Sequence, residues 1–443
     1  MKQFAARRAR LLAQMVPGAV AILPTAPEVP RNSDSDYPYR HDSYFYYLTG
    51  FTEPDSVLVL VAAQGAAGAR SILFCRQKNL EREIWDGFRY GPEGAREAFG
   101  FDAAFPIEEL DDEMTRLLSN AAAAYYALGH SATLDLQMKT WLQNVRRLSR
   151  SGVSAPDVVH NLLPMLDEMR VFKDEAEQAL MQRAATISAQ AHARAMRASR
   201  PGMFEYEIEA ELLHEFRRNG AQAPAYTPIV AAGANACVLH YSSNNAQSRD
   251  GDLILIDAGC EFDSYAADIT RTYPVNGRFS APQKALYELV LAAQSAALAV
   301  IRPGALYTDM HDAAVRVLAQ GMLDLGLLDK AAYADADAVV AERAHQQFYM
   351  HGTGHWLGLD VHDAGAYRDA RAEGKPSRPL QAGMVVTVEP GIYVRPAAGV
   401  PEQYWHIGIR IEDDVLVTAS GHTILSSAAP KTVADIERIM RRD

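Results

Sequence analysis

Cysteine is scarce in this 443-residue chain, and the three that are present, Cys75, Cys237 and Cys260, lie far apart and never form a C-x-x-C pair. We therefore expect neither a disulfide framework nor a thiolate zinc site, and the cytoplasm is the expected location. Long apolar runs are also missing, because Glu288 and Gln294 interrupt even the Ala/Leu-rich stretch around residue 290. The sequence thus predicts no membrane-spanning helix.

Positive charge is in the minority, with 43 Lys and Arg against 55 Asp and Glu and a formal net charge of −12. Nucleic acid and anionic lipid need clustered basic residues, so neither is an expected partner. The G-x-x-x-x-G-K-[ST] and G-x-S-x-G motifs are absent from the sequence. Nucleotide-dependent and serine-hydrolase functions are therefore set aside.

The length of the chain favours two domains, each able to bury its own core. Residues 1–170 mix short apolar strands at Val57–Ala62 and Ser71–Cys75 with helical stretches and a Pro-rich polar loop at 24–40. We predict a smaller amino-terminal α/β domain here. The charged stretch RVFKDEAE then opens a long helical pattern, which places the boundary near residue 170 and a second domain at 171–443.

The second domain contains internal echoes. The turn Arg200-Pro201-Gly202 recurs as Arg302-Pro303-Gly304, and each copy follows one helical stretch and precedes an amphipathic one. GDLILIDAG at 251–259 is likewise echoed by GMVVTVEPG at 383–391. The pattern indicates a duplicated unit of helices and strands, with coincidence as the alternative because both patterns are short.

Four carboxylates accompany strand-like runs in these repeats. Asp257 ends the run LILI, Asp268 lies in the returning segment of a predicted hairpin, Glu389 ends MVVTVE, and Glu412 lies in a predicted strand over 407–418. A lone acid of this kind is usually an ordinary ion-paired or turn carboxylate. If the hairpins face each other, however, the four converge, and such a site requires cations. Two divalent ions with a bridging hydroxide would neutralise it.

The stretch HGTGHWLGLDVHD at 351–363 contains His351, His355 and His362. His351 and His355 have the i, i+4 spacing of a helical zinc pair, but Gly352 and Gly354 disfavour a helix. We expect a loop or strand whose imidazoles point in different directions, one of them to a metal. Oxygen-rich ligation with one imidazole favours Mn²⁺, with Co²⁺, Zn²⁺ or Fe²⁺ as alternatives.

These motifs resemble the M24 metallopeptidases of the pita-bread fold, which include methionyl aminopeptidase, prolidase and aminopeptidase P, and the similarity is greatest to the bacterial aminopeptidase P branch. The likeness covers nearly the whole chain, including PEVPRNSDSDYPYR, LHYSSN and VPEQYWHIGIRIEDD. The family's ligand order of Asp, Asp, His, Glu, Glu is matched in DAG at 257, DITRT at 268, HWLG at 355, EPG at 389 and RIEDD at 412.

The resemblance implies an α/β fold, with a smaller amino-terminal α/β domain for oligomerisation and pocket closure and a carboxy-terminal pita-bread α+β domain of duplicated helix-plus-hairpin halves. It also implies that Asp257 ligates one metal ion, that Asp268 and Glu412 bridge two ions, and that His355 and Glu389 ligate the other. Glu389 would in addition carry a proton during the reaction.

Further roles are implied by the same resemblance. His240 and His362 would hydrogen-bond the scissile region, and Arg410 would fix the bridging Glu412. Residues of the substrate pocket would be His351, Tyr393, Trp85 and Asp34. For each of these the alternative is an ordinary packed or surface residue.

The implied reaction is hydrolysis of the bond between a first residue and a proline in second position, and the proline preference rests wholly on the resemblance. Alternatives are a prolidase, which cleaves Xaa-Pro dipeptides, and a non-catalytic peptide-binding module. A creatinase-like protein is set aside because the ligand set is complete. The resemblance also implies a homo-oligomer, either a dimer or a tetramer.

Overall fold

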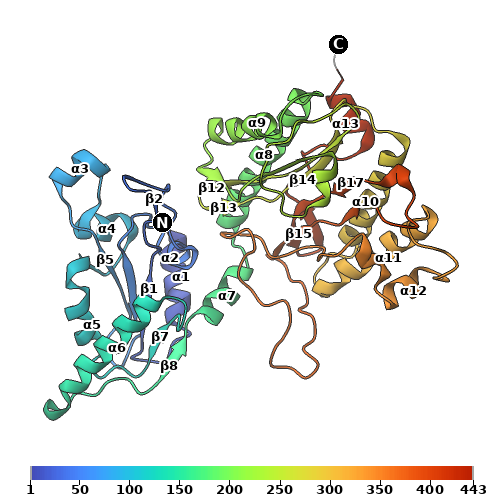
Figure 1. Ribbon diagram of the computed structural model, residues 1–443. Coiled ribbons are helices and arrows are strands. Elements are labelled where there is room, and N and C mark those ends of the chain that lie inside the picture. Colours follow the sequence, from blue (N-terminus) through green and yellow to red (C-terminus); the bar gives the residue numbers. More distant parts are fainter. Residues whose placement is uncertain (1, 442–443) are drawn as a thin grey trace. The chain divides into compact units, whose positions relative to one another are not determined.

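The computed structural model describes residues 2–441 (Figure 1). The chain divides into two compact units between Met169 and Arg170, within helix α7 (Leu163–Val171). Each unit has its own sheets and helices and is described separately below. Among the described helices, none combines the length and apolar character needed to cross a membrane.

The first unit is built around a six-stranded sheet in the order β6-β5-β4-β1-β7-β8. Strand β4 runs antiparallel to both its neighbours, whereas the other adjacent pairs are parallel. From β1 the chain therefore builds outward to β6 and then returns to β7 on the other side of β1. The strands are β1 Val20–Pro24, β4 Val57–Val61, β5 Arg70–Cys75, β6 Ala103–Pro106, β7 Ala124–Tyr126 and β8 Val159–Asn161.

Both faces of this sheet are buried, which explains its nearly continuous apolar strands. Alternate residues such as Val20, Ile22 and Val59 pack against α5 and α6, in one cluster with Met114 and Trp141. Helices α1 and α2 lie over the other face (Figure 1). The helices of this unit are α1 Lys2–Leu12, α2 Ser43–Thr49, α3 Leu80–Asp86, α4 Gly91–Phe99, α5 Leu110–Leu118 and α6 Ala132–Arg147, with 3₁₀ turns at Ile107–Glu109 and Ser149–Ser151.

The segment at 24–40, which we expected to be a loop, also contains a short exposed hairpin of β2 (Pro30–Asn32) and β3 (Ser35–Asp36). Strands of two or three residues are too short to show a period-two pattern in the sequence.

The second unit contains two helix pairs, α8 with α9 and α10 with α11, each followed by short antiparallel strands. The Pro-Gly turns at 201–202 and 303–304 join the two helices of each pair. Each second helix also begins alike: Phe204 N donates to Glu207 Oε2 at 2.7 Å, and Leu306 N donates to Asp309 Oδ2 at 2.8 Å. The duplicated arrangement that the sequence predicts is therefore present.

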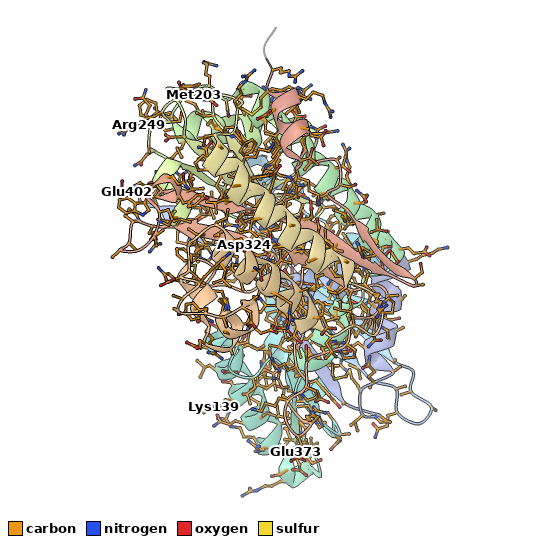
Figure 2. All side chains as sticks on the ribbon, turned by 90° about the vertical axis from the view of Figure 1, so that its right-hand side faces the viewer. Lys139, Met203, Arg249, Asp324, Glu373 and Glu402 are labelled. Carbon is orange, nitrogen blue, oxygen red and sulfur yellow. The ribbon has the colours of Figure 1, made fainter. Side chains whose placement is uncertain are left out.

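The outer faces of these helices are polar, and Figure 2 shows Asp324, the last residue of α11, at the surface. The helices are α8 Glu175–Ala198, α9 Glu205–Arg218, α10 Ala281–Ala299, α11 Tyr307–Asp324, α12 Ala336–Ala341 and α13 Val433–Ile439. The strands are β9 Ala223–Pro224, β10 Ile229–Ala232, β11 Leu253–Asp257, β12 Cys260–Phe262, β13 Tyr265–Ala266, β14 Thr270–Pro274, β15 Val385–Val388, β16 Gly391–Val394, β17 Ile407–Arg410, β18 Asp413–Thr418 and β19 Gly421–Ile424.

The expected single strand over 407–418 is wrong, because it is two strands in different sheets. Strand β17 pairs with β16 and β18 pairs with β15, and Ile411 and Glu412 lie between them. At this break Glu412 N donates to Thr270 O at 3.0 Å, so the backbone of the second half bonds to the first half. The break brings the Glu412 carboxylate beside the carboxylates of the first half.

Candidate metal centre

The five predicted ligands come together from both halves of the second unit. Asp257 is the last residue of β11 and pairs with Thr270, the first residue of β14. Asp268 lies two residues before that strand. From the second half, Glu389 directly follows β15 and Glu412 lies between β17 and β18. Strand ends from two antiparallel sheets thus deliver the four carboxylates.

Three of these residues are close enough to hold one ion. Asp268, His355 and Glu412 are buried, and each offers a ligand atom within 4.8 Å of the other two. His355 Nε2 lies 3.3 Å from Asp268 Oδ2 and 3.8 Å from Glu389 Oε1. The side chains of Asp257 and Glu389 retain 14% and 18% exposure. The cluster therefore opens toward solvent at these two acids.

Close backbone contacts explain two of the glycines around the cluster. A Cβ on Gly354 would lie 2.0 Å from Thr387 O, and one on Gly259 would lie 1.7 Å from Ala267 O. Thr387 N donates to His355 O, and His355 N donates to the Thr387 hydroxyl. The segment before His355 is thus held against β15 in a way that only glycine permits.

The 351–363 segment is not helical, as the sequence predicts, and its three histidines have different partners. His355 Nδ1 donates to Trp356 O at 2.9 Å, which leaves Nε2 directed at the acids. The ring of His362 stacks on that of His355, with centroids 3.9 Å apart. His351 Nδ1 donates to Gly352 O and its Nε2 accepts from the Tyr393 hydroxyl.

A buried ion cluster fixes the end of this segment. Arg170 Nη2 donates to Asp363 Oδ1 at 2.5 Å, and Lys173 Nζ donates to Asp363 Oδ2 at 2.9 Å. All three side chains are 1% exposed. The two cations, despite the effect of burial, hold the pKa of Asp363 below its usual value. Asp363 therefore remains ionised as an anchor for the loop that carries His355.

Mutual repulsion and burial perturb the acids of the cluster. Burial raises the pKa of Glu389 to about 7 against the attraction of His355 and Arg410. Burial and the nearby Asp268 raise the pKa of Glu412 well above its ordinary value, and burial also raises the pKa of Asp257. Without a metal, burial thus favours the protonated forms of Glu389, Glu412 and Asp257 more than water would.

His355 behaves as the cation of the metal-free cluster. Burial acts to lower its pKa, but the hydrogen bond and charge of Asp268 raise that pKa to about 9. The same hydrogen bond keeps the pKa of Asp268 low, although burial alone would raise it. Divalent ions would displace this proton, because only the neutral imidazole can ligate.

Arg410 contacts a different acid from the one that we expected. We expected it to fix Glu412, but its Nη2 donates to Asp257 Oδ2 at 2.7 Å. Its Nη1 donates to the Tyr393 hydroxyl at 2.9 Å, and that hydroxyl in turn donates to His351. The Thr270 hydroxyl links the guanidinium to Glu412: it accepts a hydrogen bond from Arg410 Nε and donates one to Glu412 Oε2.

Three residues of this site are absent from the sequence prediction. The Tyr226 hydroxyl contacts Asp257 Oδ1 at 2.6 Å and Asp268 Oδ1 at 2.5 Å, and both oxygens of Asp414 accept from Asp268 N at 3.2 Å. Thr270 could have been found, because strand alternation from Asp268 places it on the same face. Tyr226 carries no local signal; its segment is held at the site by the pairing of β9 with β12 on one side and of β10 with β11 on the other.

The remaining predicted site residues lie farther from the ligand atoms or in the first unit. His240 is exposed in the turn after the 3₁₀ helix Gly233–Cys237. Trp85 on α3 is 82% exposed, and Asp34 is exposed between β2 and β3. Both belong to the first unit, so their predicted role in closing the pocket stays a prediction.

The donor set fits divalent metal ions. Four carboxylates and one imidazole nitrogen offer hard oxygen ligands with a single nitrogen, and Arg410 and protonated His355 offset only part of their negative charge. No Cys thiol is part of the set, because Cys75, Cys237 and Cys260 are buried elsewhere.

Comparison with known proteins gives matches over both units. A family model described as "Metallopeptidase family M24" matches residues 179–419, and one described as "Aminopeptidase P, N-terminal domain" matches residues 4–126. The Xaa-Pro aminopeptidase of Escherichia coli (strain K12) is 45% identical over 439 residues, which cover 99% of this chain and 97% of that protein.

Solved structures are similar over the whole chain. The aminopeptidase PepP of Pseudomonas aeruginosa is 49% identical, with a TM-score of 0.95 and coverage of 99% of this chain and 97% of that one. Zn-substituted E. coli aminopeptidase P in complex with product is 44% identical, with a TM-score of 0.95 and coverage of 100% and 99%. These matches confirm the predicted fold class, a smaller α/β domain followed by a pita-bread domain.

Proposed function

The chain belongs to metallopeptidase family M24, and from this we propose that it removes the amino-terminal residue from peptides that carry proline in second position. It is a metallo-exopeptidase of the Xaa-Pro aminopeptidase class. The observation that carries this conclusion is the set of four carboxylates and one imidazole, with Asp268, His355 and Glu412 buried at its centre, in a chain 45% identical to a named Xaa-Pro aminopeptidase.

We infer that two divalent ions occupy the cluster. Asp257 would ligate one ion, Asp268 and Glu412 would bridge both, and His355 and Glu389 would ligate the other. The proximity of Asp268, His355 and Glu412 supports the bridging part of this assignment. When bound, such ions lower the pKa of water and polarise a peptide carbonyl.

Glu389 is suited to move the proton of the reaction. Its carboxyl group is at the open side of the cluster, where a carboxylate can accept a proton from water and later release it. Glu389 takes a proton from the attacking water and returns it to the nitrogen of the departing proline. The arrangement supports this role because Glu389 N is fixed by a 2.8 Å bond to Thr353 O.

Histidines and the arginine orient the reacting groups. We infer that His362, whose ring stacks on that of His355, and the exposed His240 donate to the carbonyl oxygen of a bound peptide. Arg410 holds Asp257 in place and, with His351, fixes the Tyr393 hydroxyl. These are positioning roles, with Tyr393 and His351 forming one wall of the substrate pocket.

For the metal, we propose Mn²⁺. The oxygen-rich ligand set with one imidazole favours it over metals that prefer thiolates. Co²⁺, Zn²⁺ and Fe²⁺ are the competing ions, and one relative is a Zn-substituted enzyme. Chelated protein restored separately with each ion, at equal free concentrations, tests the choice: Mn²⁺ should give the highest rate, and a higher rate with any other ion would contradict it.

Substrate length separates this function from its alternatives. We expect the tripeptide Arg-Pro-Pro to be hydrolysed faster than the dipeptide Ala-Pro at equal concentration. Cleavage of the dipeptide alone would favour a prolidase. Failure to cleave either, together with failure to retain metal, would favour a peptide-binding module.

We also propose a homo-oligomer in the cytoplasm. Helix α3 and the residues after it expose four large apolar side chains, Leu80, Ile84, Trp85 and Phe88, between 65% and 82%. Such a patch is typical of a protein interface. Sedimentation of wild type and of Ile84→Glu tests it: the variant should dissociate toward monomer, whereas an unchanged oligomer, or a monomeric wild type, would contradict the proposal. The three buried free thiols fit a reducing compartment.

A further inference from the structure

The segment at 233–246, which we call the His240 loop, has little regular structure of its own. Apart from one 3₁₀ turn at its start it consists of turns and irregular backbone. His240 is exposed, whereas its neighbours Leu239 and Tyr241 are partly buried against an apolar cluster that also contains Tyr393. The position of the His240 ring beside the metal centre therefore depends on what holds this loop.

One buried carboxylate receives hydrogen bonds from both arms of the loop. Glu205, the first residue of α9, is 0% exposed. Its Oε1 accepts from Ala232 N at 2.7 Å and from Asn235 Nδ2 at 2.9 Å. Its Oε2 accepts from the Tyr241 hydroxyl at 2.8 Å and from Ala246 N at 2.9 Å. The two oxygens of one side chain thus tie the start of the loop to its end.

The surroundings of Glu205 suit a carboxylate. Four donors face its two oxygens, and an ionised carboxyl group acts only as an acceptor. The amino terminus of α9 adds a favourable dipole, and hydrogen bonds to an ionised acceptor are stronger than those between neutral groups. Burial and the hydrogen bond to Glu205 raise the pKa of Tyr241 to about 12, so the tyrosine hydroxyl remains a donor.

An amide of the same shape could not replace this carboxylate. Each oxygen receives one backbone N–H, from Ala232 on Oε1 and from Ala246 on Oε2, and a backbone N–H cannot act as an acceptor. Glu205→Gln would therefore set an NH₂ group against one of these two N–H groups, whichever way its amide is oriented. One end of the loop would lose its anchor.

Backbone pairing holds the chain after the loop independently of this carboxylate. Glu205 N donates to Ala246 O at 2.9 Å, and Ser248 N donates to Met203 O at 2.9 Å. These hydrogen bonds join main-chain atoms, so they remain available when the side chain of Glu205 changes. A change at the carboxylate should therefore shift the His240 loop without unfolding the segment around it.

We infer that Glu205 is a positioning residue, which sets the place of His240 at the metal centre. Because Glu205 is fully buried, it acts through the loop and not by contact with the substrate. The inference rests on the proposed function, in which His240 donates to the carbonyl oxygen of a bound peptide. A shift of about 1 Å in such a group can lower the rate by about 10²-fold.

A double-mutant cycle with Arg-Pro-Pro as substrate tests the inference. Glu205→Gln should lower kcat about tenfold or more and change KM less than kcat, because His240 acts on the charge that develops during the reaction. In protein that already carries His240→Ala, the same substitution should change kcat by less than about twofold, since no imidazole is left to be positioned. An equal factor in both backgrounds would overturn the inference.

Glu207→Gln is the matched control. Glu207 lies in the same turn of α9, but it is exposed, and its Oε2 accepts from Phe204 N and not from the loop. This variant should keep kcat within about twofold of wild type. Tyr241→Phe removes one hydrogen bond to Glu205 and should lower kcat about two- to tenfold, again only where His240 is present. It decides the inference if Glu205→Gln fails to fold.

Hydrogen exchange of the full-length protein gives a readout that does not depend on activity. In Glu205→Gln the amides of the His240 loop should exchange faster than in wild type, whereas those of β11 should not change. Unchanged exchange in the loop would overturn the inference. A wild-type protein that cleaves neither Arg-Pro-Pro nor Ala-Pro would instead refute the proposed function itself, and the two failures are thereby distinguished.

Discussion

Individual side chains of the metal centre have properties that follow from charge and burial. Glu389, His355 and Arg410 lie within one cluster, and the pKa of each is raised for a different reason. Burial raises that of Glu389, whereas the acids near His355 and Arg410 raise theirs against the effect of burial. In the metal-free cluster Glu389 therefore holds a proton more strongly than an exposed carboxyl does, and the guanidinium of Arg410 remains charged, which suits anchoring. Two predictions follow from these differences.

Replacement of Glu389 by Gln should lower kcat for Arg-Pro-Pro by about 10²–10⁴-fold, because the amide cannot carry the proton. Metal content measured on the same sample separates a loss of proton transfer from a loss of ligation. Glu402→Gln, at an exposed acid of the 3₁₀ turn Glu402–Tyr404, is the matched control and should keep wild-type rates. A kcat of Glu389→Gln within about twofold of wild type would exclude Glu389 as the proton carrier.

Metal binding should release protons and strengthen with pH. The proton on His355, with a pKa of about 9, and that on Glu389, with a pKa of about 7, must leave before these groups can ligate. Affinity for Mn²⁺ should therefore rise as pH increases from about 6 to about 9. Titration calorimetry in two buffers of different ionisation enthalpy counts the protons released. Equal heats in both buffers would mean that no proton is released and would contradict His355 and Glu389 as ligands.

Among structural elements, the 351–363 loop has the strictest requirements. It is held against β15 at one end and by the Asp363 ion cluster at the other. The sequence showed that this segment is not a helix, because of its glycines, but it could not show which glycine is indispensable. That distinction depends on how close Thr387 lies, which is a tertiary contact.

Gly354→Ala should destabilise the protein by about 1–3 kcal/mol and remove most of its activity, because the new methyl group would overlap Thr387 O and displace His355. Gly352→Ala is the matched control, since its Cβ would come no nearer than 3.9 Å to the Gly354 carbonyl oxygen. Denaturant unfolding and Arg-Pro-Pro hydrolysis measure both effects. Equal behaviour of the two variants would show that the contact with β15 does not position His355.

Asp363→Ala should lower the free energy of unfolding by about 3–5 kcal/mol, because Arg170 and Lys173 would be left in the interior with reduced compensation. Asp360, which also pairs with Arg170 but is 46% exposed, provides the comparison, and Asp360→Ala should cost about 1 kcal/mol or less. Urea unfolding of both variants gives the two values. If the costs were similar, burial would not be the decisive property of the Asp363 cluster.

Strand ends could be predicted only in part. The runs ending in Asp257 and Glu389 were recognisable from apolar residues and a following glycine, and both are strands in the structure. The interruption at Ile411 and Glu412 was not recognisable, because the residues of this segment alternate as they would in a continuous strand. The break arises from the hydrogen bond of Glu412 N to Thr270 O in the other half. Tyr226, whose segment is held by the pairing of β9 with β12 and of β10 with β11, was missed because these are also tertiary contacts.

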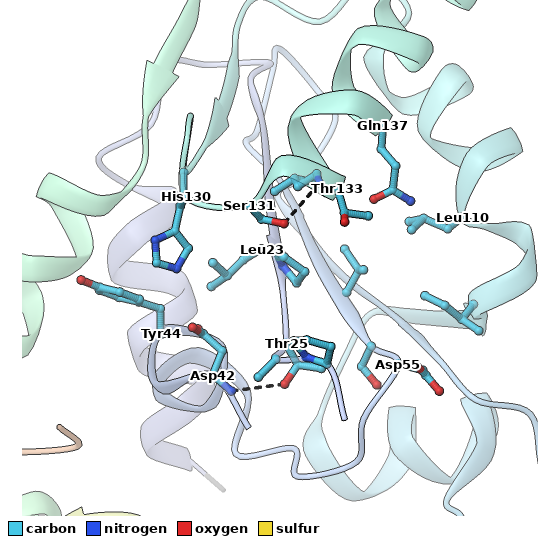
Figure 3. Close-up of a pocket in the computed structure, with 18 of the residues that line it drawn as sticks. Leu23, Thr25, Asp42, Tyr44, Asp55, Leu110, His130, Ser131, Thr133 and Gln137 are labelled. Carbon is cyan, nitrogen blue, oxygen red and sulfur yellow. Dashed lines mark hydrogen bonds between the residues drawn. The ribbon is translucent and has the colours of Figure 1, made fainter. Parts of the chain in front are cut away.

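For the molecule as a whole, duplication explains why a short sequence signal was enough to predict a three-dimensional site. Each repeat supplies two acids near the ends of antiparallel strands, and the two repeats contribute to one cluster. The fold class and the class of enzyme could be predicted because the motifs are jointly specific and the chain matches its relatives almost from end to end. The cavity of the first unit, which Figure 3 shows with Leu23, Thr25 and Ser131 in its wall, could not be predicted, because its wall is assembled from short segments without a motif.

The central claim is that the acids of two repeats hold a pair of divalent ions. Anomalous diffraction from crystals of the protein grown with Mn²⁺ tests it most directly. We predict two anomalous peaks about 3.5–4 Å apart, both in contact with Asp268 and Glu412, and loss of both peaks in Asp257→Ala/Glu412→Ala. A crystal of active enzyme with no anomalous peak among these five residues, or with its manganese bound elsewhere, would contradict the account.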